Sequence, residues 1–193
     1  MSDPVTYNFY GTTVPVLRNI SISAINTLRA AKDEQSKGGL PSDQEILDSQ
    51  LGDMLPFRVQ PALLAKFSVP ALDYLKLSKV DIPEMRNDFK TLDEVIEFFE
   101  GVKKVFDSLD EKEYNDAAGK SCEVSLGPGK PTLRMTGLAD FFHSFAVPNS
   151  YFHLNAMYML LRNAGFKLGK GMYIGTFMSE QQQKDWAPLR AGK

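Results

Sequence analysis

This sequence is poor in the residues that carry most metal, redox and nucleophile chemistry. Its 193 residues include one cysteine, two histidines and one tryptophan. The single cysteine, Cys122, excludes an internal disulfide and fits a reducing compartment. The polar, acidic start of the chain lacks the basic and then apolar pattern of a signal peptide. We therefore expect a cytoplasmic protein.

Concentrated positive charge and long apolar runs are also absent. The chain has 22 basic and 24 acidic residues and a net charge of −2, and Lys or Arg never exceeds two in a row. A nucleic-acid groove depends on clustered positive charge, so we expect no nucleic-acid partner. Every apolar stretch is interrupted well short of about 18 residues, so we expect no membrane span and no membrane partner.

The short motifs of common catalytic and nucleotide-binding sites are missing too. The chain has no G-x-S-x-G, no P-loop and no G-x-G-x-x-G. The run Gly127-Pro-Gly129 is too short for a phosphate cradle and no helix follows it, so it predicts a turn. No basic neighbour is implied for Cys122, which we interpret as a small buried hydrophobe on a strand.

What the sequence does contain is helical periodicity. A first helix is expected to begin near Thr12–Thr13, with Pro15 in its first turn, and to end in the charged, glycine-rich run 32–39. Ser42 and Glu45 form a predicted capping box for a short helix through about Gln50. The buried stripe of the first helix is Leu17, Ile20, Ala24, Leu28 and Ala31.

Two further helices are predicted before the hairpin. One spans about Phe57–Leu77 and contains Pro70, which should kink or split it because proline removes an intrahelical hydrogen bond. The other starts at a predicted capping box, Thr91–Glu94. Its broad apolar face comprises Val95, Phe98, Phe99, Val102, Val105 and Phe106.

The second half predicts a hairpin and a last helix. Residues 122–126 and 132–136 alternate in polarity around the Gly-Pro turn, as in a small β-hairpin. The last helical region spans about Leu138–Ala164, with an interruption at Pro148. We therefore expect a mainly α protein: one domain over residues 1–193, an antiparallel four-helix bundle with a small β-hairpin between the third and fourth long helices. Residues 179–193 should form a peripheral tail, with Trp186 as its expected anchor.

The two histidines do not predict a metal site. His143 and His153 are ten residues apart, which on one continuous helix is about 15 Å along the axis and about 80° around it. No HxxxH or ExxH pattern occurs, and such spacing is what helical ligand pairs require. We expect no cofactor, and leave a divalent metal open only as the disfavoured alternative.

The candidate site lies on the last helix. His153 shares one face with Met157, Leu160 and Ala164, and is interpreted either as a satisfied core histidine or as a pocket acid or base. A second stripe of polar groups with aromatic bodies, which would line a ligand pocket or face solvent, comprises Tyr151, Asn155, Tyr158 and Arg162.

Other candidates flank these two stripes. Asp140 either caps the helix or faces solvent, or it orients His143, which lies three residues later on the same face. The predicted substrate-binding residues are His143, Asn149, Asn155, Met157 and Asp140.

The run 147–175, VPNSYFHLNAMYMLLRNAGFKLGKGMYIG, resembles the C-terminal signature of the DUF1993 family. In that family a P-N-x-Y-F-H helix leads to L-R-x-x-G and then to L-G-K-x-x-Y. The matching residues are Pro148, Asn149, Tyr151, Phe152, His153, Tyr158, Leu161, Arg162, Gly165, Leu168, Gly169, Lys170, Tyr173 and Gly175.

The resemblance implies a DinB/YfiT-like four-helix bundle. Many bundles of that type hold a metal on three histidines, and they include thiol-dependent transferases and isomerases. This chain departs from them in the predicted second long helix, which has no histidine between Phe57 and Leu77. Similar fungal members imply a role in secondary-metabolite biosynthesis.

We therefore expect a metal-free enzyme, an isomerase, cyclase or lyase, acting on an apolar or aromatic small molecule. His153 would shuttle a proton, Tyr151 or Tyr158 would donate a hydrogen bond, and Arg162 would stabilise developing negative charge. The alternatives are a non-catalytic binding protein for an apolar metabolite, and a metal-dependent DinB-like hydrolase or thiol transferase. A homodimer through one face of the bundle is also possible.

Overall fold

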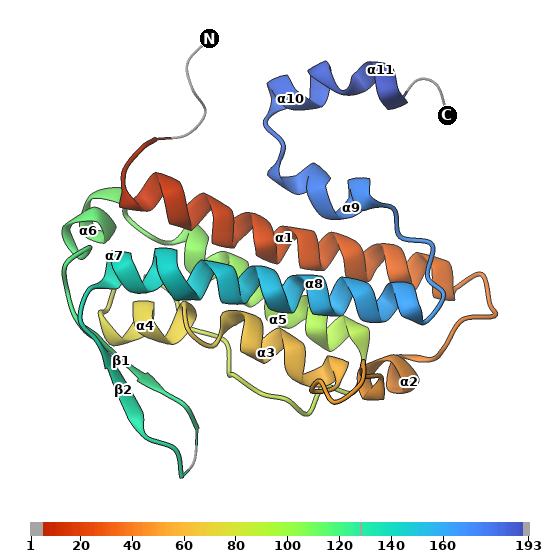
Figure 1. Ribbon diagram of the computed structural model, residues 1–193, viewed down its shortest axis with the longest axis horizontal. Helices are drawn as coiled ribbons and strands as arrows, with labels where there is room; N and C mark the ends of the chain where they lie inside the picture. Colours follow the sequence, from red (N-terminus) through yellow and green to blue (C-terminus); the bar gives the residue numbers. More distant parts are fainter. Residues whose placement is uncertain (1–5, 128, 191–193) are drawn as a thin grey trace.

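The computed structural model describes residues 6–127 and 129–190. Four helical columns surround a shared core in it (Figure 1). Helix α1 packs on α5 and α8, and α3 packs on α8 and α5, so the columns close into a four-helix bundle. The columns are α1 (Phe9–Gln35), α3 (Gln60–Ala65) with α4 (Val69–Tyr74), α5 (Leu92–Asp107) and α8 (Val147–Asn163).

Helix α1 begins earlier than the sequence predicts. Its N-cap is Asn8, whose side chain accepts a hydrogen bond from the Gly11 amide at 2.8 Å. Thr13 lies within the helix and donates its hydroxyl to the Phe9 carbonyl at 2.6 Å. The predicted start at Thr12–Thr13 is therefore wrong, and Pro15 lies inside the helix rather than in its first turn.

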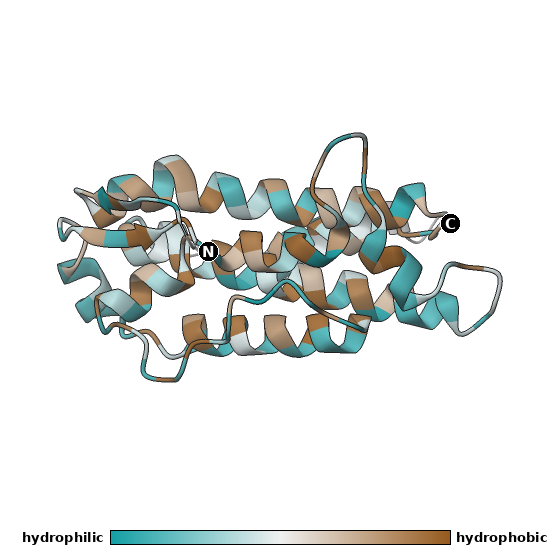
Figure 2. Cartoon of the chain, turned by 90° about the horizontal axis from the view of Figure 1, so that it is seen from below, coloured by the Kyte–Doolittle hydropathy of each residue, from teal (hydrophilic) through white to brown (hydrophobic). Residues whose placement is uncertain are grey.

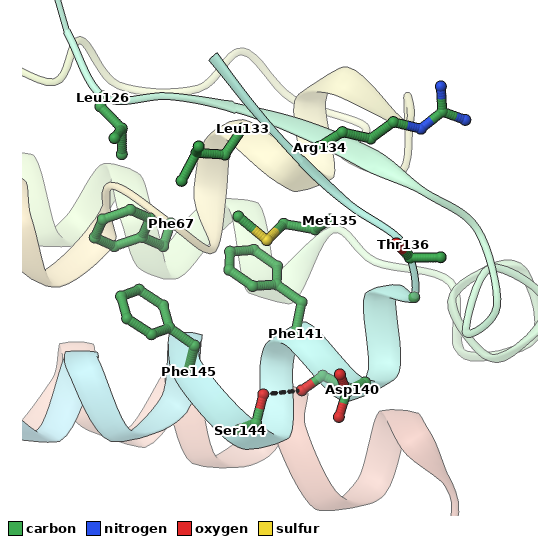
Figure 3. A pocket seen from close by; sticks show the side chains of 11 residues that line it. Phe67, Leu126, Leu133, Arg134, Met135, Thr136, Asp140, Phe141, Ser144 and Phe145 are labelled. Carbon is green, nitrogen blue, oxygen red and sulfur yellow. Dashed lines mark hydrogen bonds between the residues drawn. The ribbon is translucent and has the colours of Figure 1, made fainter. Parts of the chain in front are cut away.

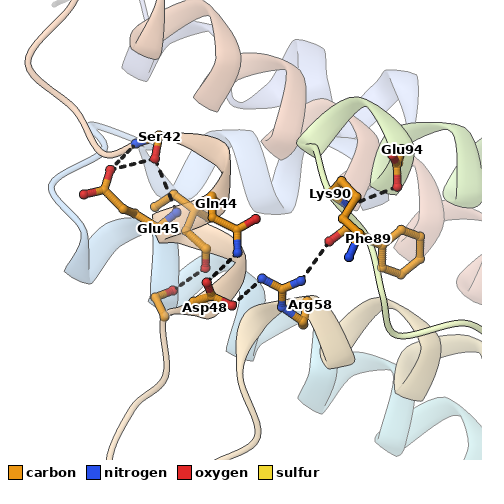
Figure 4. A network of polar contacts seen from close by, with 10 residues as sticks. Ser42, Gln44, Glu45, Asp48, Arg58, Phe89, Lys90 and Glu94 are labelled. Atoms are coloured by element: carbon orange, nitrogen blue, oxygen red, sulfur yellow. Dashed lines mark hydrogen bonds and ion pairs between the residues drawn. The ribbon is translucent and has the colours of Figure 1, made fainter.

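The predicted capping box at Ser42 is confirmed in α2 (Asp43–Asp48). The Glu45 carboxylate accepts the Ser42 amide at 2.8 Å, and the Ser42 hydroxyl accepts the Glu45 amide (Figure 4). At the other end of α2, Asp48 pairs with Arg58 of the 3-10 helix η1 (Phe57–Val59). Arg58 also donates to the Phe89 carbonyl at 3.0 Å, so one guanidinium ties α2 to the loop before α5.

The predicted second long helix is split, as Pro70 requires. Helix α3 ends at Ala65 and α4 starts at Val69. Pro61 and Pro70 each lie in the first turn of their helix, where a missing N–H costs little. At the start of α5, Thr91 accepts the Glu94 amide at 3.1 Å, but the Glu94 carboxylate binds the Lys90 amide instead of that of Thr91. Only half of the second predicted box therefore forms.

Between α5 and α8 the chain forms one unpredicted helix and the predicted hairpin. Helix α6 (Glu111–Asp116) is capped by Asp110 and buries Tyr114, and its short polar sequence has no apolar repeat that would signal a helix. Strands β1 (Cys122–Ser125) and β2 (Thr132–Met135) pair antiparallel, with Cys122 opposite Met135. The hairpin extends from the end of the bundle beside α4 (Figure 1).

The expected interruption at Pro148 is absent, because a π-helix takes its place. Helix α7 (Leu138–Phe141), the π-helix η2 (Phe142–Ala146) and α8 follow one another without a break. The Val147 amide bonds the Phe142 carbonyl five residues back. Pro148 follows at once, in the first turn of α8, where its missing N–H is tolerated.

The core runs through the middle of the bundle, and each long helix alternates hydrophobic and hydrophilic residues around its axis (Figure 2). Helix α9 (Lys170–Ile174) and η3 (Gly175–Phe177) pack on α1. Helices α10 (Glu180–Asp185) and α11 (Ala187–Arg190) lie outside the bundle (Figure 1). Trp186 is 54% exposed and does not anchor them. No helix among the described residues is long and apolar enough to cross a membrane.

Candidate functional site

His153 is held in one tautomer by a buried glutamine. Its Nδ1 lies 2.7 Å from Oε1 of Gln60, a residue 1% exposed. The Gln60 amide nitrogen donates to the Leu55 carbonyl at 2.6 Å, which leaves Oε1 as the acceptor facing the ring. The proton of a neutral His153 therefore sits on Nδ1, and Nε2 presents its lone pair. Burial lowers the pKa of His153 to about 4, so the ring is neutral at pH 7.

Tyr158 and Arg162 converge on a single backbone carbonyl. The Tyr158 hydroxyl donates to the Leu168 carbonyl oxygen at 2.8 Å, and the Arg162 guanidinium donates to the same oxygen. These bonds fasten the segment after α8 to the helix. The predicted donors for a substrate are thus engaged in holding the chain together.

The remaining α8 candidates divide between core and surface. Asn149 donates to the Leu63 carbonyl at 2.9 Å, and Met157 is 2% exposed in the core. Tyr151 is half-buried against Phe177, and burial raises its pKa. Asn155 is exposed and helps line a small hollow of about 240 Å³ between α8 and α9. These side chains therefore do not converge on one point.

His143 has a backbone carbonyl and a hydroxyl as its partners. Nε2 lies 2.9 Å from the Thr12 hydroxyl and Nδ1 lies 2.8 Å from the Ala139 carbonyl, on an exposed ring. The predicted partner, the Asp140 carboxylate, takes neither nitrogen. Asp140 contributes its carbonyl, which accepts the Ser144 hydroxyl at 2.6 Å.

The donor set does not match a three-histidine metal site. Within residues 6–127 and 129–190, no group of three or more His, Cys, Asp or Glu side chains lies close enough together to hold a metal ion. His153 has Gln60, and His143 has Thr12 and Ala139, as nearest ring partners. We assign no chemical step to a metal, and metal-free action stays a prediction.

A larger apolar hollow lies between the hairpin and the α7–η2 segment, and we call it the hairpin groove (Figure 3). Its volume is about 410 Å³. It is lined by Phe67, Leu126, Leu133, Arg134, Met135, Thr136, Gly137, Asp140, Phe141, Ser144 and Phe145.

Three phenylalanine rings form the wall of the hairpin groove opposite the strands. Phe145 meets Phe67 edge to face, with centroids 4.9 Å apart, and stacks nearly parallel to Phe141 at 6.0 Å. Phe145 is 45% exposed and Leu133 is 39% exposed. Large apolar side chains from the helix and from the hairpin therefore face the same open space (Figure 3).

Lys66 does not itself line the groove, but it contacts two residues that do. Its Nζ donates to the carbonyl of Leu126 at 2.9 Å and lies 5.9 Å from the centroid of the Phe67 ring, and both residues line the groove. The side chain is partly buried. No carboxylate of the described residues forms an ion pair with it.

Of the residues predicted for a site, Asp140 alone lines the hairpin groove. His153 lines neither that groove, nor the α8–α9 hollow, nor the two surface hollows beside Asp73 and Arg29. The groove could not be recognised from the sequence, because its walls come from three separate segments of the chain. The spacing of Phe141 and Phe145, four residues apart on one helical face, was the available signal.

Comparisons with known proteins agree with the bundle. The chain is similar to a crystal structure, at 1.83 Å, of a DinB family member protein from Shewanella denitrificans, with a TM-score of 0.69. The two are 23% identical, and the match covers 86% of this chain and 91% of the other, which supports the fold alone. No curated protein matches the chain. The domain of unknown function DUF1993 matches residues 9–174. Since that match spans most of the sequence, the chain belongs to the DUF1993 family.

Proposed function

We propose that this protein binds an apolar small molecule, of the size of a few aromatic rings, in the hairpin groove. The observation that carries the proposal is the convergence of Phe145 and Leu133, both exposed by more than a third, on a hollow of about 410 Å³. Ligand pockets typically measure about 300–1,000 Å³ and are lined mainly by apolar and aromatic side chains.

The energetics favour occupation of the groove. Covering apolar surface is worth about 25 cal/mol per Å², and both Phe145 and Leu133 expose such surface to water. Phe67 and Phe145 meet edge to face, and Phe145 remains 45% exposed, which leaves aromatic surface for a flat partner. A flat, apolar ligand therefore fits the lining better than a sugar or a nucleotide would.

The π-helix supports a binding role for the same place. Single π-turns are rare and frequently occur at functional sites. Here η2 supplies Ser144 and Phe145 to the groove, and α7 just before it supplies Asp140 and Phe141.

The test is a fluorescence titration with N-phenyl-1-naphthylamine, a neutral aromatic probe. Phe145→Ala should weaken binding about tenfold, which corresponds to about 1.4 kcal/mol. The matched control is Phe152→Ala, because Phe152 is 59% exposed on α8 and lies outside the groove lining. It should leave affinity within about twofold. Equal losses in both variants, or no binding by the wild type, would end the proposal.

A second candidate is acid–base catalysis at His153, as an isomerase, cyclase or lyase of secondary metabolism. Its support is the fixed tautomer, in which Nδ1 donates to Gln60 and Nε2 keeps its lone pair at neutral pH. The test incubates wild type and His153→Gln with small-molecule extract of the native cell and follows each compound by mass spectrometry. The role predicts a compound that the wild type consumes and His153→Gln does not. If every consumed compound is consumed equally by both proteins, or if no compound is consumed at all, the role is ruled out.

A further inference from the structure

We infer that the ligand of the hairpin groove is an organic anion: an apolar molecule carrying a carboxylate, which pairs with Lys66. The inference rests on the proposed binding function and adds the charge of the ligand. Its carrying observation is a partly buried ammonium group beside an aromatic hollow, with no counter-ion among the described residues.

Lys66 is partly buried and has no ion pair within the described part of the chain. The partly buried Lys32 and Lys103 each pair with a carboxylate, whereas other lysines without an ion pair, such as Lys104, are exposed. Lys66 has one hydrogen bond, to the Leu126 carbonyl, although an ammonium group has further N–H donors to satisfy. A ligand carboxylate in the groove would accept hydrogen bonds from those remaining donors.

The surroundings strengthen such a pair. A charge–charge attraction grows as the effective dielectric constant falls, and the groove wall beside Lys66 is made of Phe67 and Leu126. The Leu126 bond also fixes Nζ beside the groove, so little side-chain entropy remains to be lost when a ligand binds. Charge-assisted hydrogen bonds of this kind are about twice as strong as neutral ones.

The other charged residues of the groove give the ligand an orientation. Asp140 and Thr136 lie on the opposite side of the groove from Phe67 and Leu126 (Figure 3). The Asp140 carboxylate disfavours an anion on its side. The Arg134 guanidinium points away from the three rings (Figure 3). The ligand carboxylate should therefore lie by Lys66, and the apolar body should extend towards Phe141 and Phe145.

The test compares two probes that share one aromatic skeleton. N-phenyl-1-naphthylamine is neutral, and 1-anilinonaphthalene-8-sulfonate adds an anionic group. Wild type should bind the sulfonate at least fivefold more tightly, and rising salt should reduce this preference. Lys66→Gln keeps a donor for the Leu126 carbonyl but removes the charge. It should weaken sulfonate binding about tenfold and leave the neutral probe within about twofold.

Two further variants make the outcome decisive. Lys66→Arg keeps the charge and should retain the sulfonate preference. Lys104→Met removes an exposed charge on α5, which contributes nothing to the groove, and should change neither affinity. An equal loss of both probes in Lys66→Gln would show that Lys66 only anchors the hairpin and would overturn the inference. Wild-type binding of the neutral probe without a sulfonate preference would overturn it too, while the proposed function would survive. Failure of both probes to bind wild type would remove the proposed function itself.

Discussion

His153, Tyr158 and Arg162 on α8, which we call the α8 stripe, differ from the hairpin groove in whether their polar groups already have partners. On α8, the hydroxyl of Tyr158 and the guanidinium of Arg162 are already bonded to one carbonyl, and the His153 ring is bonded to Gln60. In the groove, Phe145 is exposed and Lys66 lacks a counter-ion within the described residues. A reactive residue type alone therefore does not locate a binding site. Side chains that are exposed or lack a counter-ion are the better indication of where a ligand binds.

The comparison predicts that the α8 stripe and its partner Gln60 on α3 contribute mainly to stability. Gln60→Leu should lower the free energy of unfolding by about 2 kcal/mol, because it leaves the Leu55 carbonyl and the His153 Nδ1–H without their partner. Urea denaturation measures the loss. Affinity for N-phenyl-1-naphthylamine should stay within about twofold once the protein is folded. A matching loss of affinity would mean that the two regions are one site.

A smaller effect is expected where two donors share one acceptor. Tyr158→Phe and Arg162→Ala should each lower the free energy of unfolding by about 0.5–1 kcal/mol, because the other donor still satisfies the Leu168 carbonyl. The double variant should lose more than the sum, since that carbonyl then has neither donor. Strict additivity in thermal or urea unfolding would contradict the shared-acceptor geometry.

The pH dependence of stability should separate His153 from the rest of the protein. The folded-state pKa of His153 is about 4, below the ordinary 6.5, because burial disfavours the charged ring. The unfolded chain therefore binds this proton first, and stability present above pH 6.5 is lost as pH falls towards about 4.

Carboxylates such as Asp48 and Asp107, whose pKa values lie below their usual range, also lose stabilising contacts in acid. The useful quantity is thus the difference between wild type and His153→Gln in urea midpoint across this pH range. The variant should show the shallower decline. His143→Gln is the matched control, and identical curves for wild type and His153→Gln would remove the assignment.

Local rules predicted much of the fold. The Ser42–Glu45 capping box was predictable because both partners lie within one helical turn. Pro70 predicted the split between α3 and α4, because proline removes a hydrogen bond from the helix that contains it. Asn8 was missed as the start of α1, because a start at Thr12–Thr13 places Pro15 in the first turn, where proline is favoured. Helix α6 has no apolar repeat and depends on its cap and on the burial of Tyr114.

The site was less predictable, because it depends on contacts between distant segments. Nothing local says that the His153 ring meets Gln60, 93 positions earlier, or that Lys66 reaches the Leu126 carbonyl. The π-helix is similarly hidden, since the run Phe142–Ala146 has the composition of an ordinary helix. The family pattern on α8 identified the fold, while the groove is built by Phe67, the hairpin and Phe141 together.

The most direct test of where a ligand binds is the change in backbone amide chemical shifts as N-phenyl-1-naphthylamine is titrated into isotope-labelled protein. Binding in the hairpin groove predicts that the largest shifts fall on Leu133, Met135, Gly137, Ser144 and Phe145, which line it. Shifts concentrated instead on Gln60, His153 and their neighbours would contradict the account and return the site to the α8 stripe.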